Sequence, residues 1–182
     1  MKRLTHTILL LFTTLISTSI FSAEKESKAE SALQLWADAC LYHAANYQDL
    51  TIWARANNLR RADADFSQQA LQGGKGEVWQ LSKKQNNLFL VLGATNTCAV
   101  WAAQADAKET NALFEQLMTG VEDPSPKLEV DKTVKGKDGE YRQVAYYLHP
   151  KDGPHGWIFI ATTSDSDTAA IQARLTMGPA VE

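Results

Sequence analysis

The stretch EVWQLSKKQNNLFLVLGATNTCAVWAAQ, residues 77–104, decides the fold class of this chain. It contains three strand-like runs, 77–83, 88–93 and 98–104, and the runs on either side of the middle one alternate with the period of two that β-strands have, as in Cys98, Val100 and Ala102. The polar segments KQNN and ATNT between these runs are short enough for antiparallel hairpins. LFLVL in the middle run is apolar on both faces, so we expect it to form a buried central strand.

The chain then repeats this order once. DAKETNALFEQLM follows with Asp106 as a helix cap. Its predicted apolar stripe comprises Ala112, Leu113, Leu117 and Met118. Three further strand-like runs, PKLEVDKTVK, EYRQVAYYLHP and GWIFIATT, lead into SDSDTAAIQARL, residues 164–175, which we expect to form a second helix. The pattern suggests two units of three strands and a helix, 77–120 and 121–182, although convergence also explains so loose a similarity.

Helical signals dominate residues 24–76. The first predicted helix carries one apolar stripe, which consists of Leu33, Trp36, Cys40, His43 and Tyr47. Two shorter helices follow, LTIWARAN after Asp49 and FSQQAL after Asp63 or Asp65. QGGKGE ends the helical segment, and it lacks the strand-to-helix G-x-x-x-x-G-K-[ST] pattern of a phosphate loop. We therefore predict a single α+β domain, 24–182, with an antiparallel sheet of about six strands and helices packed mainly on one face.

The first 23 residues have the order of a secretory signal peptide. Lys2 and Arg3 precede the apolar run 8–21, and the polar segment AEKESKAES follows. The run is shorter than the roughly 20 residues that a membrane span needs. We expect residues 1–23 to be removed by cleavage, which leaves an exported, soluble periplasmic protein that does not span the membrane.

Charge argues against a nucleic-acid partner. Removing residues 1–23 takes away two basic and no acidic residues, so the formal net charge changes from −3 to −5. A protein that neutralises phosphates needs a basic surface. The short basic clusters around Arg60 and Lys135 are typical of solvated surface.

Cys40 and Cys98 are the two cysteines of the chain, and in an oxidising compartment such a pair predicts a disulfide. The bridge would hold the first helix against the strand face that carries Cys98. Free buried thiols, or a reactive Cys40 beside His43, are the alternatives. The sequence contains no C-x-x-C motif, which is the pattern of a thioredoxin-like redox site.

Four motifs resemble an uncharacterised proteobacterial family of small exported proteins and lipoproteins: WADAC in the first helix, WA in the next, GGKGEVW, and CAVWAAQAD. The resemblance covers roughly residues 33–120. It is carried by Cys40, Cys98, Gly73, Gly74 and Trp79. This chain lacks the anchor cysteine of the lipidated members, and the resemblance implies compartment and architecture without implying an activity.

The last predicted hairpin carries the candidate interaction surface. It comprises Tyr141, Tyr147, His149, His155 and Trp157. Tyr141, Tyr147 and His149 are expected on one strand face, and aromatic side chains with polar ends suit protein interfaces. The alternative is that the tyrosines occur here only because tyrosine is a good strand former.

Two functions follow as hypotheses. The first is a non-catalytic periplasmic interaction protein, such as an inhibitor, an immunity-type protein or an envelope accessory, whose partner is an envelope or periplasmic protein. The second is an envelope hydrolase or metal-dependent enzyme that uses the turn from His149 to His155, with Asp152 as a further ligand. We predict no catalytic residue, metal or cofactor, and the five tryptophans argue against a roomy cavity for a small-ligand carrier.

Overall fold

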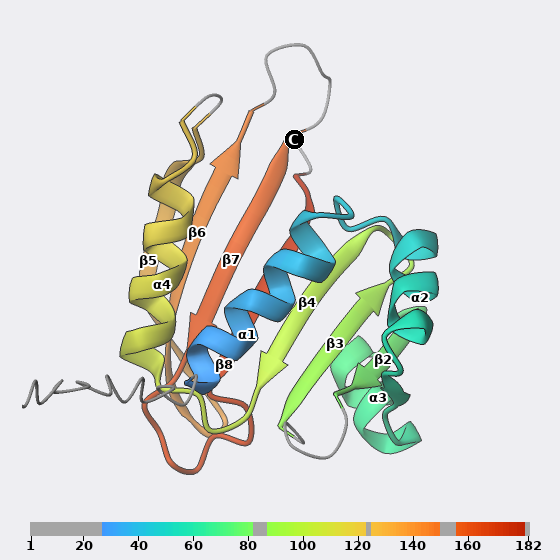
Figure 1. Ribbon diagram of the computed structural model, residues 1–182. Coiled ribbons are helices and arrows are strands. Elements are labelled where there is room, and N and C mark those ends of the chain that lie inside the picture. Colours follow the sequence, from blue (N-terminus) through green and yellow to red (C-terminus); the bar gives the residue numbers. More distant parts are fainter. Residues whose placement is uncertain (1–26, 82–86, 123–124, 150–155, 181–182) are drawn as a thin grey trace, which may run out of the picture.

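The computed structural model describes residues 27–81, 87–122, 125–149 and 156–180, so the predicted signal peptide lies outside the described residues (Figure 1). The helices are α1 (Lys28–Trp36), α2 (Tyr47–Ala56), α3 (Ala64–Leu71) and α4 (Ala107–Thr119), with a π-helical turn η1 (Ala37–Leu41) after α1. The strands are β1 (Arg60–Arg61), β2 (Gly76–Gln80), β3 (Leu88–Gly93), β4 (Thr97–Ala102), β5 (Lys127–Gly136), β6 (Gly139–Leu148), β7 (Trp157–Thr163) and β8 (Ala173–Pro179).

These strands form one antiparallel sheet in the order β1-β2-β3-β4-β8-β7-β6-β5. The α+β class is confirmed, and the sheet has eight strands where we expected about six. β4 pairs with β8, with Val100 opposite Leu175, and this contact joins the two halves of the chain into a continuous sheet.

The predicted helix over residues 164–175 is wrong. Residues 164–172 form a loop, and β8 begins at Ala173. Ala173, Leu175 and Met177 are buried at every second position, which is strand periodicity. β8 lies between β4 and β7 and pairs with both, so these ladders override the helical preference of the segment. The second half is therefore not a repeat of the first.

The helices lie mainly on one face, as predicted, with one exception. α1, α2 and α4 cover one face of the sheet, and their apolar residues join the largest core cluster, which includes Trp36, Leu50 and Phe114 (Figure 1). α3 lies on the opposite face, where Ala70 packs with Val78. None of the described helices is long and apolar enough to cross a bilayer.

The first helix is shorter than predicted. α1 ends at Trp36, η1 carries Cys40, and α2 starts at Tyr47, where Asn46 and not Asp49 accepts the capping hydrogen bonds. The predicted disulfide is confirmed: Cys40 and Cys98 are bonded, with their Cα atoms 5.5 Å apart. The bridge joins η1 to β4.

Asp106 caps α4 as predicted, because its carboxylate accepts a hydrogen bond from the Glu109 N–H at 2.7 Å. The predicted stripe of this helix is rotated. Ala112 is exposed, whereas Phe114 is fully buried. Phe114 contacts the ring of Trp36, so the packing partner selects the buried face.

Candidate functional site

The structure separates the predicted interaction residues onto two faces. Tyr141 and Tyr147 share the face of β6 opposite to α1 and α4, about 20 Å apart along the strand. Tyr141 is buried over Gly136, and Tyr147 is half-buried over Gly156. Trp157 lies on the other face and packs against the main core. It therefore does not form one continuous surface with the two tyrosines.

The candidate catalytic turn is described only at its start. His149 is exposed just after β6, and its ring centroid lies 3.9 Å from that of Tyr147. Asp152 and His155 lie outside the described residues. Among the residues that the structure does describe, no three His, Cys, Asp or Glu side chains are grouped in a way that would hold a metal ion.

The face of the sheet that carries the two tyrosines is covered by a helix at one end only. α3 packs over β2, β3 and β4, and no described helix covers β8, β7 and β6 on this side (Figure 1). We call this uncovered part the open face. It comprises Gln143, Ala145, Tyr147, Ile158, Ile160, Thr162, Arg174 and Thr176, with Trp101 at its border. Most of these side chains are half-buried, including Ile158 and Ile160.

Arg174 lies on β8 at the border of the open face, directly opposite Trp101 of β4. Its guanidinium carbon is 4.4 Å from the ring centroid of Trp101 and 5.9 Å from that of Tyr141, so it lies between two aromatic faces. Its Nε is buried and has no hydrogen-bond partner among the described residues. Such a nitrogen normally has an acceptor, because burying an unpaired polar group is costly.

The two edges of the sheet are protected against further pairing. β1 has two residues. β5 is longer, but it carries charged side chains along its length and an irregularity between Leu128 and Val130. Charges, bulges and short strands are the usual means by which proteins prevent edge-to-edge pairing. The open face is therefore a better candidate for recognition than either edge.

Arg142 on the helix-covered side of β6 differs from Arg174 because it is paired with carboxylates. Its Nε and Nη2 donate to both oxygens of Asp131 at 3.0 and 2.9 Å, and Nη2 is 3.0 Å from Glu115 Oε1. Hydrogen bonding from Arg142 lowers the pKa of Asp131. The pair ties β6 to β5 and to α4, and its solvent exposure limits what it contributes to stability.

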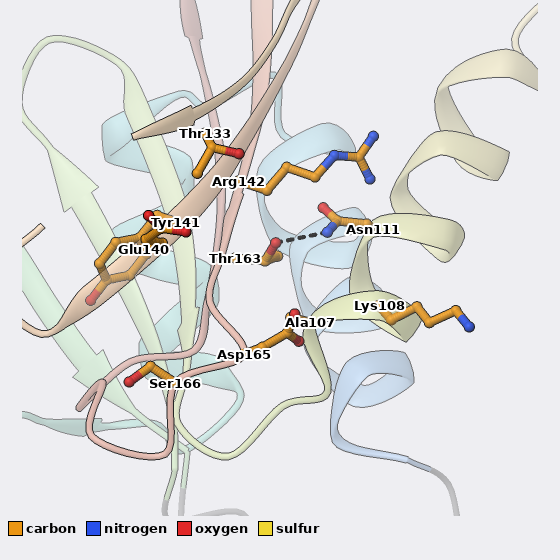
Figure 2. Close-up of a pocket in the computed structure, with 10 residues that line it drawn as sticks. All are labelled: Ala107, Lys108, Asn111, Thr133, Glu140, Tyr141, Arg142, Thr163, Asp165 and Ser166. Carbon is orange, nitrogen blue, oxygen red and sulfur yellow. Dashed lines mark hydrogen bonds between the residues drawn. The ribbon is translucent and has the colours of Figure 1, made fainter. Parts of the chain in front are cut away.

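A polar cleft of about 510 Å³ lies between the start of α4 and the ends of β5, β6 and β7 (Figure 2). Its lining comprises Ala107, Lys108, Asn111, Thr133, Glu140, Tyr141, Arg142, Thr163, Asp165 and Ser166. Asn111 Nδ2 donates to Thr163 Oγ1 at 2.7 Å, and both residues are buried. Figure 2 shows the Lys108 side chain pointing away from this pair. The hydrogen bond joins α4 to β7, so these two residues of the cleft stabilise the packing of the helix on the sheet.

Replacing Asn111 with alanine is expected to lower the free energy of unfolding by about 1–2 kcal/mol, because the buried Thr163 hydroxyl then loses its partner. Urea denaturation measures this loss. The control is Gln116→Ala, an exposed position on the same helix, which should change stability by less than about 0.5 kcal/mol. Equal effects of the two substitutions would contradict a stabilising role for the Asn111–Thr163 bond.

Sequence reasoning missed the arginine of the open face. The predicted helix over residues 164–175 contains Arg174. A helical assignment does not indicate that this residue lies opposite Trp101 and Thr162 on neighbouring strands. A signal for the strand was present: Ile171, Ala173, Leu175 and Met177 alternate with polar residues or glycine. This period of two would have placed Arg174 on the opposite face from its apolar neighbours.

Comparison with known proteins adds no relative. No family model matches the chain. No curated protein and no solved structure shows significant similarity to it either.

Proposed function

We propose that this protein is a non-catalytic binding protein of the periplasm that docks a partner protein on the open face of its sheet. The observation that carries the proposal is the absence of a covering helix over β8, β7 and β6 in the described chain, although Ile158 and Ile160 lie there. Large uncovered apolar surfaces bordered by polar groups are typical of interaction sites, and these two half-buried isoleucines lie among polar neighbours on an uncovered sheet. Trp101 and Tyr147 add aromatic area of the type that anchors interfaces.

The proposed compartment rests on two features. Residues 1–23 have the order of an export signal, and the Cys40–Cys98 bridge is of the kind that persists in oxidising compartments. The resemblance of residues 33–120 to a family of small exported proteins agrees with this compartment and remains part of the proposal. An inhibitor, an immunity-type protein and an envelope accessory would each use a rigid, cross-linked scaffold of this kind.

Replacing Ile160 with glutamine is expected to weaken partner binding about tenfold, because it removes apolar area from the middle of the open face. Chemical cross-linking in the envelope of the cells that produce the protein captures its partner, and mass spectrometry measures how much partner is recovered with each variant. Circular dichroism checks that the variant is folded.

Ile52→Gln is the matched control. Ile52 is 66% exposed on α2, away from the open face, so the same change there should leave partner recovery unaltered. Recovery of the same partner at equal yield with wild type, Ile160→Gln and Ile52→Gln would refute the open face as the docking surface.

A further inference from the structure

We propose that Arg174 is the anchor of the open face and recognises a carboxylate of the partner, either an acidic side chain or a chain terminus. This inference rests on the proposed function, because it names the chemistry of the partner at the same surface. Arginine matches carboxylates well because its planar guanidinium can donate two parallel hydrogen bonds.

The surroundings of Arg174 hold the guanidinium in place and leave it without an anion. Trp101 and Tyr141 flank it at 4.4 and 5.9 Å. Trp101 also contacts Phe66 of α3, with ring centroids 6.0 Å apart. A cation held between aromatic faces loses little conformational freedom when it binds, so its position favours recognition.

Two other arginines of the sheet show what Arg174 lacks. Arg61 lies over the ring of Trp79, with its Cζ 3.9 Å from the centroid, and its guanidinium is paired with the carboxylate of Glu77. Arg142 is paired with Asp131 and Glu115. Arg174 has the aromatic contacts of the first but, among the described residues, no carboxylate.

The residues that pair with Arg174 and follow it across the sheet carry no negative charge. Thr162 lies next to it on β7, Gln143 follows on β6 and Lys132 on β5. An acidic partner group would therefore meet a cation whose nearest neighbours in this row are neutral, with a second cation, Lys132, further along and no carboxylate in the row.

The charge arrangement also disfavours a phosphate polymer as the occupant. A phosphate polymer requires several cations in a row, whereas the next cation in the row of Arg174 is Lys132 of β5, with the neutral Thr162 and Gln143 between them. A protein segment that combines apolar side chains with one carboxylate fits Ile158, Ile160 and Arg174 together.

The direct test uses sodium isovalerate, a branched carboxylate, with isovaleramide as its neutral counterpart. The indole N–H signal of Trp101 in a proton–nitrogen correlation spectrum reports on Arg174, and Trp101→Phe identifies that signal. We expect a saturable shift with isovalerate, half-complete on the order of tens of millimolar. Isovaleramide should give less than a fifth of that shift at the same concentration.

Three variants make the result specific. Arg174→Gln should abolish the isovalerate response, Arg174→Lys should weaken it at least threefold, and Arg60→Gln, an exposed arginine on β1, should leave it unchanged. If Arg174→Gln does not fold, Arg174→Lys decides alone. No shift in the wild type, an equal shift with isovaleramide, a stronger response to inorganic phosphate, or an undiminished response in the Arg174 variants would overturn the carboxylate assignment.

The same variants separate this inference from the proposed function. Arg174→Gln should reduce recovery of the cross-linked partner at least fivefold. If Ile160→Gln loses the partner while Arg174→Gln retains it fully, the carboxylate anchor is wrong and the docking surface stands. If neither variant changes the recovery, the docking surface is wrong as well.

Discussion

Replacing Cys40 and Cys98 together with alanine is expected to lower the free energy of unfolding by about 4 kcal/mol. The two residues are 58 positions apart, and cross-linking so long a loop restricts the unfolded chain strongly. Both cysteines are fully buried, so a double substitution avoids leaving one thiol unpaired in the core. Urea denaturation of the oxidised wild type and the double variant measures the difference.

Wild-type protein unfolded and refolded in the presence of a reductant is the control for this prediction. Its free energy of unfolding should fall close to that of the double variant, because both lack the cross-link. A loss below about 1 kcal/mol in both samples would show that the bridge contributes little beyond the packing of η1 on β4.

Replacing Trp36 with alanine is expected to cost about 3–5 kcal/mol, the range for removing a large aromatic side chain from a core. Trp36 is fully buried, and its ring lies 5.7 Å from Phe114 of α4 and 6.2 Å from Phe159 of β7. The side chain therefore links α1, α4 and the sheet. Denaturant unfolding followed by far-ultraviolet circular dichroism measures the loss.

Trp36→Phe provides a sharper comparison. The indole Nε1 is buried without a hydrogen-bond partner among the described residues, so phenylalanine removes an unpaired donor together with some volume. We expect it to cost less than half of what Trp36→Ala costs. Tyr42→Ala, at an 83% exposed position, should change stability by less than about 0.5 kcal/mol. A loss as large for phenylalanine as for alanine would mean that shape, and not buried area, dominates at this position.

Local signals predicted much of this fold because they depend on neighbouring residues. The run LFLVL, which is apolar on both faces, predicted β3 as a buried strand, and Asp106 predicted the start of α4. The pairing of Cys40 with Cys98 followed from their number and expected compartment, although the pairing geometry belongs to the folded chain.

The candidate site was harder to predict, as Tyr141 and Trp157 illustrate. Both were expected in one surface because they belong to the same hairpin. Pairing across the sheet places Tyr141 opposite Val134 and Trp157 opposite Leu148, on different faces. Which face becomes core depends on where α1 and α4 pack, and that information is spread over the whole chain.

By itself the sequence determined the α+β class, the strand-forming runs from Gly76 to Thr163 and the cap of α4, because periodicity and capping depend on residues that are close in the sequence. It also determined the cysteine pair, because the chain contains two cysteines. The tertiary structure decided between the helical and the strand signals of residues 173–179, which form a central strand, and it alone decided that Phe114 faces the core. It also decided that Arg174 lies between Trp101 and Tyr141. A strand between β4 and β7 gains hydrogen bonds on both sides, and this non-local gain outweighs the helical preference of the same residues.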